Sequence, residues 1–264
     1  MLTKLFHDPI TLAAVQAVVA GTLALTVALL ARWLQLNMEK DIAIALVRGL
    51  IQVVIVGMVL LVIFQEPVFV GFLILVGMMF AAAWTSAKRA RGLPDAFRVS
   101  LYSIALGSGS IIIVMLLIGV LELKLTALIP VGSMLLANSM NTASLAFNRF
   151  RGEVLSHVGH IETALSLGAS PRAAVMPYIR EAIMASLIPR VDSLRSLGIV
   201  WIPGVMTGML LGGSHPVRAA FYQFVIMSMI LTVSALTSII AIFLMSQRIF
   251  SPAEQLLLRS ESGD

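Results

Sequence analysis

The sequence predicts an all-α integral membrane protein with about seven transmembrane helices, and three observations lead to this fold class. Of its 264 residues only 12% are charged, about half the share found in an ordinary soluble domain. The mean hydropathy of the chain is +1.00. Apolar runs close to the roughly 20 residues that cross a bilayer as a helix recur along the chain. These runs are too long and too uniformly apolar for barrel strands, whereas a helix satisfies its own backbone in lipid.

The apolar runs, taken in order, place seven predicted spans in one transmembrane domain, residues 1–264. The first run is as long as a full span, so we do not interpret it as a cleaved signal. The third is the weakest, because only three residues separate it from the second. The predicted spans are Ile10–Ala31, Ile42–Phe64, Val68–Ala87, Val99–Leu121, Leu125–Phe147, Leu187–Leu211 and Ala219–Met245.

The basic residues predict the orientation of these spans. One side of the predicted membrane carries only Lys4, Lys124 and Arg218. The other side carries Arg32, Lys40, Lys88, Arg89, Arg91, Arg98, Arg149, Arg151, Arg172, Arg180, Arg248 and Arg259. The positive-inside rule therefore predicts an outside N-terminus and a cytoplasmic C-terminus, in the cytoplasmic (inner) membrane.

The remaining composition excludes several function classes. The net charge is +5, but the basic residues are dispersed between apolar runs, so we expect no nucleic-acid partner. The chain has no cysteine, which removes disulfides and thiolate metal sites. His157 and His160, three residues apart, are expected to be surface residues and not a metal-ligand set. No nucleophile–base pair emerges, so we expect a non-catalytic subunit.

Polar residues inside the predicted second and fifth spans are candidates for a translocation path, because they are costly in lipid. In the second span Gln52 lies one turn after Arg48, which we interpret as reaching toward the interface. In the fifth span Asn138 and Asn141 are three residues apart and need polar partners or a wet cavity. Met134 is a soft potential metal ligand or an ordinary core residue.

The only long connection, residues 148–186, predicts a helix–turn–helix elbow on the cytoplasmic side. Val154, Val158, Ile161 and Leu165 recur at helical spacing and form an apolar face. Gly168 has the position of a helix C-cap. Ser170–Pro171 is typical of an N-cap followed by the first residue of a second helix.

The segment Glu162–Gly168 resembles the E-A-A-x-x-x-G element of ABC transporter permeases, with Thr163 in place of the first alanine. In that superfamily the element is a coupling helix that inserts into a groove on the ATP-binding subunit. The resemblance assigns ATPase coupling to Glu162, Ala164, Gly168, Ser170, Pro171 and Arg172. The sequence contains no phosphate-binding loop, so ATP-Mg is expected on a partner chain and no cofactor on this one.

The predicted sixth span combines a carboxylate with helix-breaking residues. Asp192 lies three residues before Arg195 and is either a structural ion pair or a cation-interacting group of the path. Met206 is a further path candidate. Pro203 predicts a kink. Gly204, Gly208 and Gly212 recur every fourth residue, which favours close helix packing.

A closer resemblance covers most of the chain after the first span. Ser166–Pro171, Ile188–Ser193 and Leu197–Gly204 resemble the FetB-type permeases, an iron-export ABC family to which plant aluminium-tolerance permeases are similar. The match continues at Met206, Gly208, Pro216 and Tyr222–Gln223, and upstream at Arg48, Gln52, Ala82–Trp84, Lys88–Arg89, Ile129–Pro130, Met134 and Asn138. This chain departs from similar bacterial sequences at Ser133, Ala137 and Asn141.

What the resemblance implies is a permease that exports iron or another metal ion, driven by a separate FetA-like ATPase. A permease homodimer with two ATPase chains is the expected assembly, because seven spans are few for a complete path. The plant members are associated with nucleotide sugars, which keeps a different cargo open. A secondary transporter or a membrane scaffold subunit are the remaining alternatives, although a secondary transporter would need carboxylates near the midplane.

Overall fold

The computed structural model describes residues 9–34, 39–90 and 92–258, and within these ranges the chain is helical and forms no strand. This confirms the all-α fold class. Lys4, Arg91 and Arg259 of the orientation argument lie outside the described residues. The elements are α1 (Pro9–Trp33), α2 (Glu39–Ile63), α3 (Val68–Arg89), α4 (Ala96–Ile104), a π-helical turn η2 (Ala105–Gly109), α5 (Ser110–Leu117), α6 (Leu125–Ser156), α7 (Val158–Ser166), α8 (Pro171–Arg195), α9 (Gly204–Leu211) and α10 (Pro216–Arg248).

The chain divides into two compact units, Met1–Glu66 and Pro67–Asp264. In the first unit α1 packs against α2. None of the residues of α2 is buried, although it is the most apolar helix long enough to cross a membrane. A helix this apolar with no buried face matches a segment whose solvent is lipid.

Among the described residues, four helical stretches are long and apolar enough to cross a bilayer by length and composition: Glu39–Ile63, Val68–Arg89, Ala96–Leu117 and Pro216–Arg248. They correspond to the predicted second, third, fourth and seventh spans. A shorter apolar stretch, Thr11–Val27, lies inside α1. The count of seven and the orientation stay predictions.

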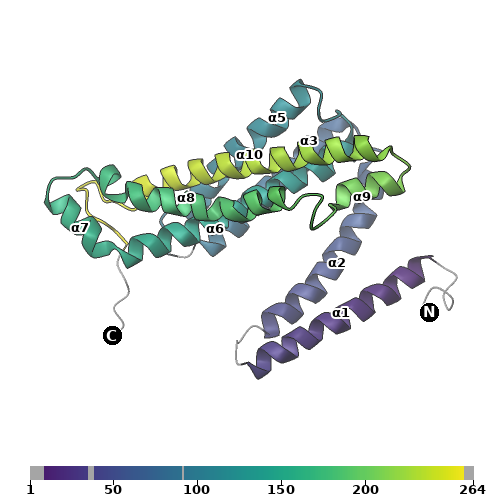
Figure 1. The fold of residues 1–264 in the computed structure, drawn as a ribbon, viewed down its shortest axis with the longest axis horizontal. Coiled ribbons are helices and arrows are strands. Elements are labelled where there is room, and N and C mark those ends of the chain that lie inside the picture. The colour runs from purple at the N-terminus through teal and green to yellow at the C-terminus, as the bar shows by residue number, and fades with distance from the viewer. Residues whose placement is uncertain (1–8, 35–38, 91, 259–264) are drawn as a thin grey trace. The chain divides into compact units, whose positions relative to one another are not determined.

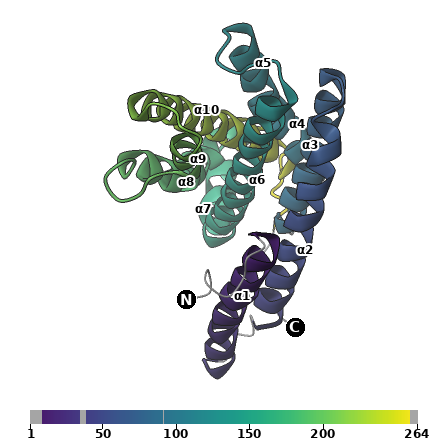
Figure 2. The same cartoon turned by 90° about the vertical axis from the view of Figure 1, so that its right-hand side faces the viewer.

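The second unit is built around α6. This helix packs against α3 and α4 and also against α8 and α10, and Figure 2 shows it between these two groups. Its buried residues fall into two apolar clusters. Phe147 and Phe150 belong to the first, which also includes α7, α8 and the last residues of α10. Leu128 and Leu135 belong to the second, which includes α3, α4 and α5.

The predicted fourth span forms as one helical stretch, α4–η2–α5, with the π-helical turn in its middle. A side chain at Gly107 of this turn would collide with Thr237 of α10, so glycine permits the close approach. The hydroxyls of Ser108 and Ser139 are hydrogen-bonded, and Ser139 lies 3.1 Å from Thr237 Oγ1. Small hydroxyl residues therefore join α6, α10 and η2 at close range, as in other membrane helix contacts.

Two predicted spans differ from the structure. The helix that contains the predicted fifth span, α6, continues beyond Phe147 to Ser156. The sixth was expected to be one kinked helix from 187 to 211, and this is wrong: α8 ends at Arg195 and α9 begins at Gly204. Pro203 has extended dihedrals and precedes α9. Proline disfavours helical geometry in the residue before it, so the chain breaks here and does not merely bend.

Candidate functional site

The turn between α7 and α8, residues Glu162–Arg172, is called here the elbow turn. Gly168 has a φ of +86°. The N–H of Gly168 donates to the carbonyl of Leu165 and the N–H of Ala169 to that of Ala164, each at 3.0 Å. These two bonds form a Schellman motif, which needs a left-handed residue at the position of Gly168. Gly168 thus ends α7, as the sequence predicted, and the carbonyl of Ala164 accepts the bond from Ala169.

The start of α8 also agrees with the prediction. Ser170 is the N-cap, and its hydroxyl accepts from the N–H of Ala173 at 3.4 Å. Pro171 is at the first helical position, where its missing N–H costs nothing. The guanidinium of Arg172 lies 5.6 Å from the ring centroid of Phe243 on α10. The turn is therefore held by local hydrogen bonds and by one contact to α10.

The apolar face predicted for the elbow is confirmed. Ile161 is fully buried, and Val154 is fully buried on α6 before the break. Val158 and Leu165 pack against the same cluster. The opposite face of the turn is open: the side chain of Glu162 is exposed and Leu167 is 83% exposed. Glu162 and Leu167 therefore lie on the face of the turn that the rest of the second unit leaves open.

The elbow's first arm is interrupted at His157, between α6 and α7. The Nδ1 atom of His157 lies 2.8 Å from the carbonyl oxygen of Glu153. Its ring stacks on Tyr178 of α8, with 4.8 Å between centroids, and His160 lies 5.7 Å away. Of the two histidines expected at the surface, His160 is exposed, whereas His157 is half-buried and packs the break against α8.

A C-terminal hairpin, residues 249–258, packs beside the elbow turn. The N–H of Ser251 donates to the carbonyl of Gln255 at 2.9 Å, and that of Leu257 to Ile249 at 2.8 Å. Leu256 and Leu258 are buried in the cluster that contains the elbow. Figure 1 shows this yellow segment next to α7, with α9 at the other end of the same unit. The segment has no periodic apolar pattern, so sequence reasoning did not predict this hairpin.

Two open pockets flank the junction of the elbow turn and the hairpin. One, of about 630 Å³, is bordered by Glu162, Gly168 and Ser170 and by the hairpin residues 253–256. The other, of about 660 Å³, is bordered by Ser170, Pro171 and Arg172 together with Phe243 and hairpin residues. Five of the six residues assigned to ATPase coupling thus border these pockets, and the sixth, Ala164, holds the turn.

A third pocket, of about 440 Å³, lies among α6, α8, α9 and α10 and is called here the α8 pocket. It contains Met134 and Asn138 of the predicted path. Its described lining is Met134, Asn138, Arg190, Ser193, Trp201, Pro203, Gly204, Val205, Gln223, Met227, Ile230 and Leu231. The carboxamide oxygen of Gln223 accepts from the N–H of Met206 at 3.2 Å, so Met206 joins the pocket through its backbone.

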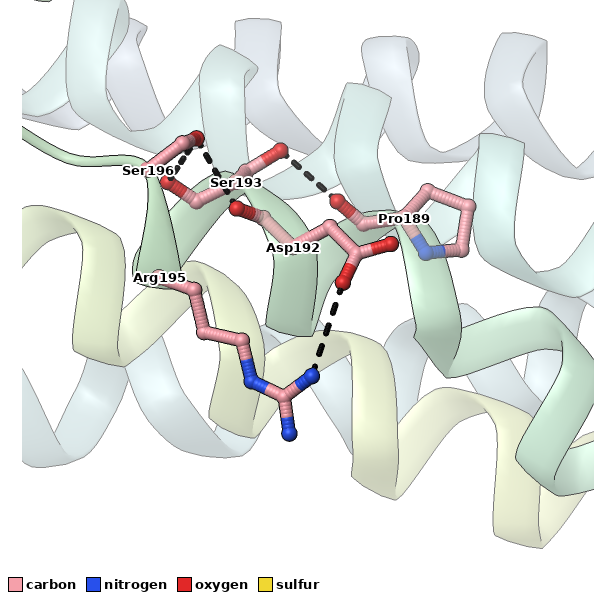
Figure 3. A network of polar contacts seen from close by, with 5 residues as sticks. All are labelled: Pro189, Asp192, Ser193, Arg195 and Ser196. Atoms are coloured by element: carbon pink, nitrogen blue, oxygen red, sulfur yellow. Dashed lines mark hydrogen bonds and ion pairs between the residues drawn. The ribbon is translucent and has the colours of Figure 1, made fainter. Parts of the chain in front are cut away.

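The other path candidates lie elsewhere. Asp192 is exposed, and its carboxylate lies 3.8 Å from the Arg195 guanidinium, which confirms the ion pair and is shown in Figure 3. Asn141 is exposed on α6 and does not line the pocket. It shares a face with Ser133 and Ala137, each one turn apart. Gln52 is exposed on α2 in the first unit, and its part in a path stays a prediction.

The glycine face of α9 is open within the second unit. A side chain added at Gly204 or Gly208 would meet nothing within 4 Å, and at Gly212 it would meet only the carbonyls of Gly208 and Met209 in the same helix. Leu211 beside them is 86% exposed. Close helix packing through these glycines therefore stays a prediction.

Sequence reasoning missed Arg190, Trp201 and Gln223 as lining residues of the α8 pocket. Gln223 is 3% exposed in an otherwise apolar helix, and that contrast was a readable signal. The described residues contain no group of three or more His, Cys, Asp or Glu side chains able to hold a metal ion.

At the far end of the unit, the connection before α6 carries an exposed ion pair. The Lys124 ammonium lies 2.8 Å from a Glu122 carboxylate oxygen. The hydrogen bond from Lys124 lowers the pKa of Glu122, and the same contact raises the pKa of Lys124. The pair is fully solvated and contributes little to stability.

Comparison with known proteins decides the family. The model of the uncharacterised protein family UPF0014 matches residues 14–250. The chain belongs to this family. It is 36% identical over 225 residues to the probable iron export permease protein FetB of Escherichia coli, covering 85% of this chain and 87% of that one. It is 31% identical over 231 residues to the protein ALUMINUM SENSITIVE 3 of Arabidopsis thaliana, covering 87% and 84%. The UPF0014 membrane protein YjkA of Bacillus subtilis is 32% identical over 222 residues, covering 83% and 88%. No solved structure matches the chain.

Membership of UPF0014 confirms the resemblance that the motifs indicated and makes this chain a multi-pass protein of the inner membrane. The most specific of the matching segments converge in two places in the structure. Ser166–Pro171 forms the elbow turn, and Ile188–Ser193 with Leu197–Gly204 borders the α8 pocket. These segments thus lie at the two ends of α8.

Proposed function

We propose that this chain is the permease subunit of an ABC transporter that exports iron or another metal ion across the cytoplasmic membrane. A separate FetA-like subunit binds ATP-Mg and hydrolyses ATP, and this chain binds no cofactor of its own. Two permease chains form a homodimer with two ATPase chains. The cargo follows the printed name of the Escherichia coli relative, and a different cargo, such as a nucleotide sugar, is the alternative.

The observation that carries the proposal is the elbow turn. Its backbone is fixed by the Schellman bonds and the Ser170 cap, and its inner face is buried against α6 and α8. Its outer face presents Glu162 and Leu167. A turn with a rigid backbone and an exposed outer face can be displaced by a partner and can transmit that displacement. A flexible loop cannot.

The helix α8 connects this turn to the pocket. It runs unbroken for 25 residues from Pro171 to Arg195, which corresponds to about 37 Å at 1.5 Å per residue. Arg190 and Ser193 near its far end line the α8 pocket. In the proposed cycle, closure of the ATPase moves the elbow turn, and α8 carries the displacement to the pocket where the cargo passes.

The distribution of charge supports a cytoplasmic elbow. Arg151, Arg172 and Arg248 gather at the elbow end of the unit: Arg151 lies beside Gly92, Arg172 on Phe243, and Arg248 pairs with Asp95. The opposite end holds Lys124 and Arg218, together with Arg195, which pairs with Asp192. Under the positive-inside rule this distribution supports a cytoplasmic elbow end, where an ATPase partner would operate.

The test is ATP-dependent iron flux in liposomes with this chain and its candidate ATP-binding subunit. We expect wild type and Glu181→Ala, an exposed α8 carboxylate outside the elbow turn, to transport. Glu162→Ala should lose most flux while both chains still co-purify. ATPase stimulation without iron flux would retain the ABC permease and reject the iron cargo. If no ATP-binding subunit binds or is stimulated, the proposal fails, and the secondary-transporter and scaffold alternatives replace it.

A further inference from the structure

Arg190 is a charged side chain of the α8 pocket that finds no partner among the described residues. It is partly buried and lies in the segment predicted as the start of the sixth span. Within the described residues it makes no ion pair and no hydrogen bond. A guanidinium at such a place is costly unless it finds an acceptor, because it carries five N–H donors and a permanent charge.

The charge on the described lining of the α8 pocket is only positive. None of the described residues that line it is acidic, and Arg190 is the one ionised group among them. The nearby carboxylate of Asp192 is exposed and faces Arg195. A bare metal cation entering this pocket would therefore meet a positive charge without a carboxylate to offset it.

Arg190 and Gln223 offer the pocket N–H donors that no described group accepts. The carboxamide oxygen of Gln223 accepts from the N–H of Met206, and its amide hydrogens stay available to donate. Asn138 donates one amide N–H to the carbonyl of Met134, which leaves its carboxamide oxygen as an acceptor, and the hydroxyl of Ser193 donates to the carbonyl of Pro189. Arg190 is the one charged donor among these groups, and a carboxylate or phosphate is the group that matches a guanidinium fork.

We propose that the α8 pocket binds an anionic oxygen group, carboxylate or phosphate, through Arg190 and Gln223. This inference rests on the proposed permease function and names its substrate class: a metal ion passes as an anionic complex with a carboxylate or phosphate chelator, not as the bare cation. The same chemistry fits the headgroup of an anionic lipid. The soluble and the lipid source differ in how the ligand is delivered.

The first experiment measures binding by the full chain in nanodiscs of phosphatidylcholine. The probes are citrate, ferric citrate, inorganic phosphate and Fe²⁺ without a chelator. We expect at least one oxyanion probe to bind wild type, and Arg190→Gln to weaken it about tenfold or more. Arg190→Lys should retain part of the affinity. Arg195→Gln, an exposed cation on the same helix outside the pocket, should match wild type.

The second experiment identifies the lipid source. Nanodiscs of phosphatidylglycerol are compared by native mass spectrometry. Retention of phosphatidylglycerol by wild type and Arg195→Gln but not by Arg190→Gln would support the same site with a headgroup in it. The inference is overturned if Arg190→Gln binds or retains every anionic probe as wild type does. It is also overturned if Fe²⁺ alone binds while no anion does, a result that would favour Met134 and Met227 as soft ligands.

The outcome stays separable from the proposed function. Thermal unfolding of each variant shows whether Arg190→Gln is folded, and Arg190→Lys tests the site if it is not. ATPase stimulation by the partner subunit is measured on the same preparations. Anion binding that needs Arg190, without any stimulation of an ATPase, would retain this site and reject the ABC mechanism. If ATPase stimulation and flux of free Fe²⁺ both survive Arg190→Gln, the ABC mechanism is retained and the anion site is rejected.

Discussion

The two ends of α8 differ in how they are held. At the elbow end the first turn is capped by Ser170, and the residues behind it, Val175 and Ile179, are buried with the hairpin leucines. At the pocket end the helix stops at Arg195, and Ile199 and Val200 that follow are 85% and 78% exposed. One end is fixed by contacts within the second unit, while at the other end apolar side chains and a cation find no partner among the described residues of that unit.

This difference matches two tasks. A coupling surface transmits displacement only when it keeps a single conformation. Buried packing and satisfied helix caps provide that rigidity. A cargo pocket has to change during a cycle, and a broken helix with few internal contacts can do so at low cost. A rigid elbow end and a loosely packed pocket end on the same helix are therefore both consistent with transport. Mutations can test each end separately.

The largest expected effect comes from the hairpin at the elbow end. Leu256 is 6% exposed, whereas its neighbour Leu257 is 55% exposed. Leu256→Ala should destabilise the protein by about 2–4 kcal/mol, because it removes buried methyl groups and leaves a cavity. Thermal unfolding in detergent measures this as a clearly lowered midpoint.

Two control variants test whether the loss of stability is specific to the buried leucine. Leu257→Ala on the same hairpin and Ile199→Ala at the pocket end should unfold within a degree or two of wild type, since both side chains are already exposed. An equal loss for Ile199→Ala would mean that the two ends of α8 are held alike, and the contrast drawn here would be wrong.

The second effect, smaller in stability but large in coupling, is expected at Gly168. Its φ of +86° is strained for any residue with a Cβ, although no atom lies within 4 Å of that position. Gly168→Ala should cost about 1–2 kcal/mol and shift Glu162 and Leu167 on the exposed face. ATPase stimulation by the permease should fall more than thermal stability does.

Gly159→Ala is the matched control for the backbone. Gly159 also has open space around it, but its φ is not positive, so alanine should be tolerated there. If Gly168→Ala stimulates the ATPase as wild type does, the left-handed turn is not part of the coupling element.

The residues that sequence reasoning placed correctly are those whose chemistry is local. Gly168, Ser170 and Pro171 determine where one helix ends and the next begins. These residues lie within four positions of one another, so a short segment of sequence contains the whole signal. The charge pair of Asp192 and Arg195 was predictable for the same reason, because three residues along a helix fix a neighbour.

The residues that it misplaced depend on the rest of the fold. Pro203 predicts a kink as readily as a break, and only the packing of α9 on α10 decides between them. The hairpin exists because Leu256 and Leu258 are buried by helices far away in the sequence. Arg190 lies in the pocket because α6 and α10 face that side of α8, which no spacing along α8 itself could show.

The smallest expected effect tests how the pocket end is tied together. The N–H of Met206 donates to the buried carboxamide oxygen of Gln223, and this bond anchors the first turn of α9 on α10. Gln223→Met keeps the length and removes the acceptor, so it should cost about 1 kcal/mol. Because that loss is local, hydrogen exchange at the start of α9 should quicken about fivefold while the midpoint of unfolding moves little.

The control is Gln247→Met, at an exposed glutamine on the same helix as Gln223. It should leave the exchange rate and the midpoint of unfolding unchanged. Unaltered exchange in Gln223→Met would show that α9 is held by something other than this bond, and the pocket end would then be less loose than its exposed residues indicate.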